Sequence, residues 1–526
     1  MALAPYFARA ALAAAQVIAG YDPDVFEARL TEQPVGLSMS SSGCRTREGR
    51  AIADLAVRLL ARLYPVLDLR IADDGLASDL AALARRINPL VDFAADAPIG
   101  IVVGEGARRF ERSVFAGSNG WIARVGAQAP YPVGDSLHAF GAGAAACLAA
   151  ANLFRLVFLP PELYAADTDA SLNTWALDSG DSPGGPAHAL DVPRGTLIGL
   201  GAVGHGVGWA LCNSAVTGSI TLIDHEALDL GNVQRYVLAE LDHVGNMKVD
   251  VMAGAMRASL TVDACAETFE AFVDRVGHSV DLAIVALDSA ASRRAVAASL
   301  PWRVVNAWTQ PGDLGVSVHG AFGGAGACLE CMYVAEGRTP NEDELVAAAL
   351  KIPEEVRTVR QLLVDGSAVP APILDLIADH LRIERTRIRS FSGRPIRDLY
   401  VQGLCGGALV PIATLGGTRP EVHVPLAHQS SLAGVLLAAA AVREANDGPG
   451  ATTTVTRLNV LAGVASVPRQ PMAARRQGCI CRDRDYVDRF RTKWSGQDQV
   501  ASDGLGAVGP SRVPSEGPAK DRRESA

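Results

Sequence analysis

Three glycines lie between two apolar runs in the middle of the chain, in the sequence TLIGLGAVGHGVGWALCNSAVTGSITLID from Thr196 to Asp224. Gly199, Gly201 and Gly204 form the pattern G-x-G-x-x-G, a turn that lets backbone NH groups approach phosphates at a helix N-terminus. Asp224 follows the second apolar run, at a position where an acidic side chain accepts hydrogen bonds from the hydroxyl groups of a nucleotide ribose. The stretch therefore predicts a strand, a glycine turn, a helix and a strand that bind a nucleotide.

The glycine pattern alone would suit NAD as well as ATP. Two cations after this stretch favour ATP. Arg235 lies in LGNVQRYVL with Asn232 and Gln234, and Lys248 follows. A triphosphate that undergoes cleavage needs its charge neutralised, whereas a dinucleotide diphosphate at a helix N-terminus has little need of two added cations. Asp288 ends the apolar run DLAIVALD, at the carboxyl end of a predicted parallel strand, where a carboxylate could hold Mg²⁺. Together these residues indicate magnesium-bound ATP.

The same segments resemble a known family. GLGAVG, LIDHEALDLGNVQRYVL, VALDSAASR and CLEC are similar to the adenylation domain of ubiquitin-activating enzymes and of the bacterial ThiF and MoeB proteins. The resemblance covers residues 194–333 closely and resumes near Pro425. It departs at Gly231, where the family usually has serine, and we expect the lost hydroxyl contact to be minor. By position, the resemblance implies that Asp224 contacts the ribose. It implies that Asn232, Arg235 and Lys248 contact the phosphates and that Asp288 holds the magnesium.

The resemblance also implies a reaction. The C-terminal carboxylate of a small ubiquitin-like protein attacks the α-phosphate of ATP, giving an acyl adenylate and pyrophosphate. A cysteine then takes the acyl group as a thioester and passes it to a conjugating enzyme. The whole chain resembles the activating enzyme of bacterial ubiquitin-like conjugation systems, some of which act in antiphage defence. We expect the conjugating enzyme to be a separate protein, because no conjugating-enzyme domain is visible in the sequence.

Cys405 is the candidate for that thioester. It lies in LYVQGLCGGALVPI, before two glycines, which suits an exposed thiol in a mobile loop that must reach an acyl adenylate. Ubiquitin-activating enzymes carry their thioester cysteine in extra helical material hereabouts. The alternative is a small apolar residue on a buried strand. His423 and His428 follow, and either could lower the pKa of the thiol.

Two close pairs of cysteines indicate a metal site. Cys328 and Cys331 lie in GACLECMY, and Cys479 and Cys481 lie in RRQGCICRD. Four thiolates suit tetrahedral Zn²⁺, which would tie the C-terminal segment to the nucleotide-binding core as a staple rather than a catalyst. The alternative is four unrelated free thiols. The family would normally show C-x-x-C in the second pair, and the tighter C-x-C could leave the site distorted or empty.

The first part of the chain repeats the order of elements of the second. A helical pattern over Arg50–Leu63 leads into VLDLRIAD, a helix over Ala82–Ile87 follows, and PIGIVVGEG reads as a buried strand. LSMSSSGCRTREGR replaces the glycine turn, and no set of Asn, Arg and Lys follows, so we expect this copy not to bind ATP productively. The resemblance implies that such an inactive half lends an arginine to the active site. Candidates are Arg45, Arg47 and Arg50, each of which could equally be a solvated surface residue.

The expected fold is therefore α/β, with two Rossmann-like adenylation-type halves, the first inactive and the second active, packed as a pseudo-dimer with a helical insertion for the catalytic cysteine. The expected domains are an inactive half (1–160), a linker (161–193), the active ThiF-type domain (194–335), the insertion (336–420), the return to the adenylation domain with the zinc-binding end (421–494) and a disordered tail (495–526).

Composition limits the partners. The net charge of −9 gives no electrostatic reason to expect nucleic acid or an acidic membrane surface. Residues Ala10–Gly20 are apolar but lack the features of a signal peptide, so we expect an N-terminal helix, and no later run is suited to span a bilayer. Nine cysteines are too few for a disulfide scaffold and indicate reduced thiols in the cytoplasm. Whether the fused halves pair further as a homodimer stays open.

Three other functions remain as alternatives. A sulfur-carrier adenylyltransferase would share the adenylation step but would not use Cys405. An NAD-dependent oxidoreductase shares the glycine turn but has little need of Arg235 and Lys248. A non-catalytic scaffold would require both halves to be degenerate, which the intact set in the second half argues against.

Overall fold

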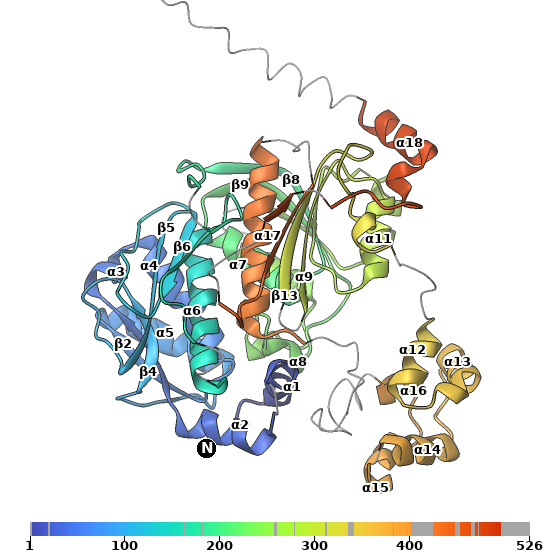
Figure 1. The fold of residues 1–526 in the computed structure, drawn as a ribbon, viewed down its shortest axis with the longest axis horizontal. Helices are drawn as coiled ribbons and strands as arrows, with labels where there is room; N and C mark the ends of the chain where they lie inside the picture. The colour runs from blue at the N-terminus through green and yellow to red at the C-terminus, as the bar shows by residue number, and fades with distance from the viewer. Residues whose placement is uncertain are drawn as a thin grey trace, which may run out of the picture.

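Two β-sheets, one in each half of the chain, organise the computed structural model (Figure 1). The structure describes residues 3–495 apart from 19–20, 161–164, 180–181, 257–259, 278, 311–312, 335–340, 382, 401–423, 448–452, 464–468 and 472. Each sheet has buried apolar strands at its centre and helices against its faces, which confirms the expected α/β class.

The first sheet has strands β1 (Val35–Met39), β2 (Val66–Ile71), β3 (Asp92–Phe93), β4 (Ile99–Val103), β5 (Arg112–Asn119), β6 (Ile122–Gly126) and β7 (Ala170–Asn173). Their order is β3-β2-β1-β4-β5-β6-β7, parallel up to β5 and antiparallel from β5 to β7. β7 lies in the segment expected to be a linker. That part of the prediction is wrong, because buried Leu172 and its neighbours pair with β6 and complete the sheet.

The second sheet has strands β8 (Leu190–Ile198), β9 (Val216–Ile223), β10 (Thr261–Cys265), β11 (Leu282–Val285), β12 (Arg303–Gln310), β13 (Asp313–His319), β14 (Thr454–Leu458) and β15 (Arg469–Pro471). Their order is β10-β9-β8-β11-β12-β13-β14-β15, again parallel up to β12 and antiparallel beyond it. Strand for strand, this repeats the first sheet with β15 added. The structure therefore contains the duplication that the sequence pattern indicates.

Three helices of each half hold equivalent places in the chain order. α4 (Arg47–Leu60), α5 (Asp74–Ile87) and α6 (Phe140–Phe158) correspond to α7 (Ala202–Cys212), α9 (Lys248–Met256) and α17 (Ala427–Asp447). The other helices are α1 (Phe7–Val17), α2 (Pro23–Glu32), α3 (Ser41–Arg45), α8 (Leu230–Val233), α10 (Phe269–Val276), α11 (Ala290–Ala298), α12 (Glu342–Ala349), α13 (Val356–Asp365), α14 (Ala371–Leu381), α15 (Arg385–Ile388), α16 (Ile396–Asp398) and α18 (Arg484–Trp494), with short 3₁₀ turns that include η2 (Glu330–Met332).

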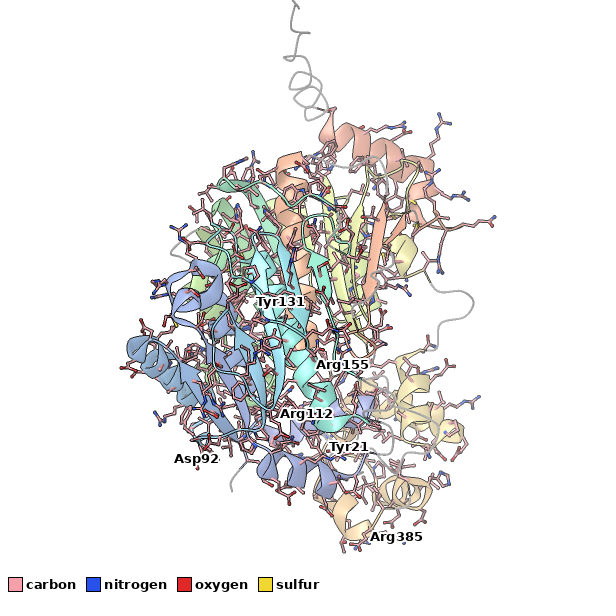
Figure 2. The ribbon with its side chains drawn as sticks, turned by 60° about the vertical axis from the view of Figure 1, so that its left-hand side comes forward. Tyr21, Asp92, Arg112, Tyr131, Arg155 and Arg385 are labelled. Carbon is pink, nitrogen blue, oxygen red and sulfur yellow. The ribbon has the colours of Figure 1, made fainter. Side chains whose placement is uncertain are left out.

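α6 and α17 run side by side between the two sheets and form the centre of the pseudo-dimer (Figure 1). α17 also lies against α7 with almost no space between the backbones, since a Cβ at Gly434 would lie 2.6 Å from the Cα of Gly206. α6 is long and apolar enough to cross a membrane, but 94% of that stretch is buried inside the protein. Its composition therefore reflects its place in the core between the halves. At its end, Arg155 forms a buried ion pair with Asp167 (Figure 2).

One connection differs between the two halves in its length. Among the described residues of the first half, residues 72–73 alone lead from β2 to α5, whereas residues 224–247 lead from β9 to α9. The longer connection contains Asp224, Asn232 and Arg235, and α9 begins with Lys248. The first half therefore lacks the whole segment that could bind a triphosphate.

Helices α12 to α16 form the predicted helical insertion and have a hydrophobic core of their own, which includes Val359, Ile377 and Leu399. Arg385, labelled in Figure 2, belongs to this insertion and lies away from both sheets. α1, which begins at Phe7, extends into the apolar run Ala10–Gly20 and buries Leu12 in the main hydrophobic core, as expected for an N-terminal helix.

Candidate active site

The glycine turn joins β8 to α7 as the sequence predicts. Gly199 has a φ of +91°, a conformation that glycine adopts without strain, and a Cβ at Gly204 would lie 2.4 Å from the carbonyl oxygen of Gly199. Leu200 NH donates a hydrogen bond of 2.8 Å to Asp224 Oδ2. Asp224 is thus held beside the turn, at the carboxyl ends of two adjacent parallel strands, where open α/β sheets bind nucleotides.

Tyr236 lies between the two predicted cations. Its hydroxyl oxygen would be 3.7 Å from a Cβ at Gly201 in the glycine turn, and its ring centroid lies 5.4 Å from both Arg235 Cζ and Lys248 Nζ. Lys248 is buried and pairs with Glu226. Burial acts to lower the pKa of Lys248, but Tyr236, Asp224 and Glu226 outweigh it, so the pKa lies above its ordinary value. Both cations therefore lie at the turn, and Lys248 stays charged.

Arg9 approaches the same place from α1. A Cβ at Gly231 would lie 3.1 Å from Arg9 Nε, and Arg235 donates a hydrogen bond of 3.1 Å to the carbonyl oxygen of Gly231. Two arginine side chains thus lie close to one glycine, and burial lowers the pKa of Arg235. Tyr6, before Arg9 in the chain, packs in one apolar cluster with Tyr236 and the start of α7.

Arg9 is not among the arginines of the first half that the sequence suggested. Arg47 and Arg50 instead line a groove of about 630 Å³ that is formed by α4, α5 and residues 212–215 of the second half, and Arg50 Nε donates to the carbonyl oxygen of Cys44. Arg45 belongs to α3, at the start of α4, and no described contact joins it to the second half. A single arginine in an alanine-rich helix gave no signal that could have identified Arg9.

Arg62 is another residue of the first half that the sequence did not mark. It is fully buried and donates hydrogen bonds to three carbonyl oxygens of the second half, those of Val233, Tyr236 and Ala239, at 2.6–2.8 Å. Burial lowers its pKa to about 10. These carbonyls belong to residues before and after Arg235 in the chain. Arg62 of the first half therefore fixes the position of the segment that contains Arg235.

The structure does not bring Gln234 into this group. Its side chain is buried in a small closed cavity with Tyr64 and His428, and its Oε1 has no hydrogen-bond partner among the described residues. Asn232 does belong to the segment, where its Oδ1 accepts a hydrogen bond from Asp229 NH and caps α8. Gln234 and Arg235 therefore point to different sides of the same turn.

Asp288 lies in the loop between β11 and α11 and is exposed. Its negative charge acts to raise the pKa of both Arg235 and Arg293 of α11, against the effect of burial, so its carboxylate lies near both guanidinium groups. The preceding strand pairs with β8, so the loops that hold Asp288 and Gly199 leave adjacent strands. A carboxylate in this position could hold a cation against the phosphates of a nucleotide.

The four cysteines of the two pairs come together although they are far apart in the sequence. Their Sγ atoms all lie within 4.8 Å of one another and all four residues are buried. Three of the Sγ separations are 3.9 Å between Cys328 and Cys331, 3.4 Å between Cys328 and Cys479, and 3.5 Å between Cys331 and Cys481. A tetrahedral zinc with Zn–S bonds of about 2.3 Å requires separations of about 3.8 Å. The donor set fits zinc, and the C-x-C pair closes the cluster.

Comparison with known sequences agrees with this geometry. A sequence model of the ThiF family matches residues 188–466. The chain belongs to the ThiF family. Membership supports an ATP-dependent adenylyltransferase as the activity of the second half. A relative of 37% identity over 517 residues, covering 95% of this chain and 99% of its own length, is the uncharacterized protein y4jF of Sinorhizobium fredii (strain NBRC 101917 / NGR234).

A second family model, Prokaryotic E2 family C, matches residues 39–159. This match differs from the expectation that no conjugating-enzyme domain is visible in this ThiF-family chain. The matched residues include β2 to β6 of the first sheet, whose strand order repeats that of the second sheet, as expected for an adenylation-like copy.

Two solved structures show distant likeness to this ThiF-family chain. A crystal structure of E. coli MccB with MccA-N7isoASN is 15% identical, covers 55% of this chain and 66% of its own, and has a TM-score of 0.33. E. coli MccB with ATP is 14% identical, covers 55% and 67%, and has a TM-score of 0.32. Likeness at this level carries no argument about the activity of the chain.

Cys405 and His423 lie outside the described residues, and so do residues 496–526 of the expected tail. His428 is described and is buried at the start of α17, where its ring lies 5.8 Å from that of Phe154. Burial, with a further contribution from Arg155, lowers the pKa of His428 to about 3, so its ring is neutral at physiological pH.

Proposed function

We propose that the second half uses ATP to adenylate the C-terminal carboxylate of a ubiquitin-like protein, and that Cys405 then takes the acyl group as a thioester for a conjugating enzyme. The observation that carries the adenylation step is the arrangement around Tyr236. Its hydroxyl lies by the glycine turn, and Arg235 and Lys248 lie over its ring at equal distances. ThiF-family membership supports the same chemistry.

In the proposed reaction, Asp224 accepts hydrogen bonds from the ribose, and the backbone of the glycine turn approaches the phosphates. A carboxylate oxygen of the substrate forms a bond to the α-phosphorus, and the bond to the bridging oxygen breaks as pyrophosphate leaves. Arg9, Arg235 and Lys248 stabilise the charge that develops on the phosphates. Asp288 would hold Mg²⁺, which neutralises part of that charge.

In the second step, the Cys405 thiolate attacks the acyl carbon, and AMP leaves with the electrons of the broken bond. The helical insertion supports this step, because its separate core makes a distinct unit next to Cys405 in the sequence. A carrier-protein adenylyltransferase without a thioester would not need such a unit.

We further propose that the four-cysteine cluster holds a structural Zn²⁺. The cluster supports this because four buried thiols converge at separations near those of tetrahedral zinc. Zinc thiolates and a reactive thiol both require reducing conditions, so we assign the protein to the cytoplasm.

The test of the adenylation step is the exchange of labelled pyrophosphate into ATP. The ubiquitin-like protein from the gene neighbourhood should stimulate exchange, and the same protein with an amidated C-terminus should not. Lys248→Ala should reduce exchange by at least about a hundredfold, because the charge on the phosphates then lacks a buried counter-ion. Exchange that is indifferent to the free carboxylate would contradict the proposed substrate.

A further inference from the structure

Helix α11 connects the loop of Asp288 with the turn that bears the first cysteine pair. Ser289, next to Asp288, caps α11 by accepting a hydrogen bond of 3.0 Å from Ser292 NH. The η2 turn, which contains Cys331, packs against the same helix. We propose that Arg293 of α11 is a positioning residue for Asp288 and that Tyr333 couples the cysteine cluster to this position. The role given to Asp288 rests on the proposed function.

Arg293 holds the backbone that precedes Asp288. Its Nη2 donates one hydrogen bond to the carbonyl oxygen of Leu287 and another, of 3.1 Å, to that of Ala307 in β12. The side chain is buried, and its Nε has no partner among the described residues. A buried guanidinium with an unsatisfied donor is costly for a fold to retain. A role in fixing the Asp288 loop to the sheet explains why it is there.

Tyr333 covers the guanidinium of Arg293. Its ring centroid lies 4.9 Å from Arg293 Cζ, and its hydroxyl oxygen accepts a hydrogen bond of 3.1 Å from Asn306 Nδ2 in β12. Tyr333 directly follows η2, and its NH donates a hydrogen bond of 2.8 Å to the carbonyl oxygen of Glu330. The path to Asp288 therefore begins at η2, which contains Cys331 and is followed directly by Tyr333, and continues through the contacts of Tyr333 with Arg293 and of Arg293 with Leu287.

A second contact between α11 and the cysteine turn provides a matched control. Arg294 forms an ion pair of 3.3 Å with Glu330, which lies between Cys328 and Cys331. Arg294 is half exposed, whereas Arg293 is buried, and none of its described contacts reaches the Asp288 loop. Removing the Arg294 side chain should therefore loosen the surface of the turn without releasing Leu287.

This path gives the cysteine cluster a second role besides stapling the C-terminal segment to the core. If the cluster opens, η2 loses its anchor, Tyr333 leaves the guanidinium of Arg293, and the Asp288 loop gains freedom. The nucleotide site then weakens although no residue that touches the nucleotide has changed.

The direct test is hydrogen exchange of the full-length protein without ligand, followed at the backbone amides of residues 286–290. Arg293→Met and Tyr333→Leu should each raise exchange there by about tenfold, since each removes contacts to a charged buried group. Cys481→Ser should also raise the hydrogen exchange of these amides. Arg294→Met should leave these amides within about twofold of the wild-type protein, because none of the described contacts of Arg294 reaches the Asp288 loop.

The companion measurement is the KM for Mg-ATP in pyrophosphate exchange. Arg293→Met and Tyr333→Leu should raise this KM more than they lower kcat, and Arg293→Lys should recover part of the loss because it can still donate to Leu287. If Arg293→Met does not fold, Tyr333→Leu carries the same expectation. Unchanged exchange at residues 286–290, or a uniform rise over the whole second sheet, would overturn the inference.

The two measurements separate this inference from the proposed function. Selective loosening of residues 286–290 in a protein that exchanges no pyrophosphate would support the positioning of Asp288 and refute adenylation. Pyrophosphate exchange in the wild-type protein, with no selective loosening in the variants, would refute the coupling and leave adenylation standing.

Discussion

Arg9 lies against Gly231, so closely that a Cβ at this glycine would be 3.1 Å from Arg9 Nε and 3.2 Å from Arg9 Cγ. From the sequence alone, we expect this glycine only to remove a minor serine contact. The structure gives it a different meaning, because the missing side chain leaves room for an arginine from the N-terminal helix. An arginine of the first half and a glycine of the second thus fit together at the nucleotide site.

Replacing Arg9 should impair adenylation directly. Arg9→Ala should lower the rate of pyrophosphate exchange by about tenfold to a hundredfold, because one charge that opposes the phosphates is lost. Thermal unfolding should change little, since the guanidinium of Arg9 forms no ion pair among the described residues. Arg47→Ala is the matched control, since Arg47 lines the groove between α4 and α5. Equal losses in both variants would contradict the assignment.

A side chain at position 231 should act through Arg9. Gly231→Ser should reduce exchange by a fewfold, because a Cβ this close forces the guanidinium to move. The double variant Arg9→Ala, Gly231→Ser should be no worse than Arg9→Ala alone, since the two changes remove one interaction. Additive losses, measured as rates of pyrophosphate exchange, would show that Gly231 acts independently of Arg9.

Buried histidines should make the fold sensitive to acid. Burial lowers the pKa of His319 to about 4 and that of His428 to about 3, and it also depresses the pKa of His205. The unfolded chain, with pKa values of about 6.5, then binds more protons than the native state at lower pH. The three histidines therefore contribute fully to the free energy of unfolding above about pH 6.5. As the pH falls below this value, the free energy of unfolding declines by about 1.4 kcal/mol per pH unit for each histidine.

Urea unfolding at neutral pH and at about pH 5 measures this dependence. His428→Gln should lower the stability at neutral pH and flatten the decline by the share of one proton. An undiminished slope in His428→Gln would show that His428 does not titrate on unfolding.

The cysteine cluster should contain zinc. Metal analysis of protein purified without chelator should find about one zinc per chain, and the double variant Cys479→Ser, Cys481→Ser should lose it. The melting temperature should fall in the same variant, because metal binding contributes to the folding free energy. Cys212→Ser, which alters a thiol outside the cluster, should retain the metal. Zinc retained in the double variant, or zinc absent from the wild-type protein, would contradict the site.

Much of this architecture was predictable because its signals are local. The glycine turn, Asp224 and the apolar runs of the parallel strands each specify structure over a few residues, and the structure has them where the pattern indicates. The duplication was also readable, since hydrophobic periodicity survives where the glycine turn of the first half does not. Cys328 and Cys481 could be assigned to one cluster because cysteine pairs have few other uses in a reduced protein.

What the sequence did not predict depends on contacts between the halves. Arg9 and Arg62 meet the second half only after both sheets have folded and packed, and neither lies in a motif. β7 was assigned to a linker because its short run of Ala170–Asn173 is surrounded by Asp, Ser and Gly. Gln234 was placed with the phosphate ligands by its neighbours in the sequence, although the turn directs its side chain into the interface.

The measurement that tests the central claim most directly is a non-reducing gel of the protein mixed with Mg-ATP and the ubiquitin-like protein from its gene neighbourhood. The account predicts an adduct that disappears on treatment with thiol and that is absent from the Cys405→Ala variant, while both proteins release pyrophosphate. Pyrophosphate release without an adduct in either protein would contradict the thioester and leave adenylation alone as the function.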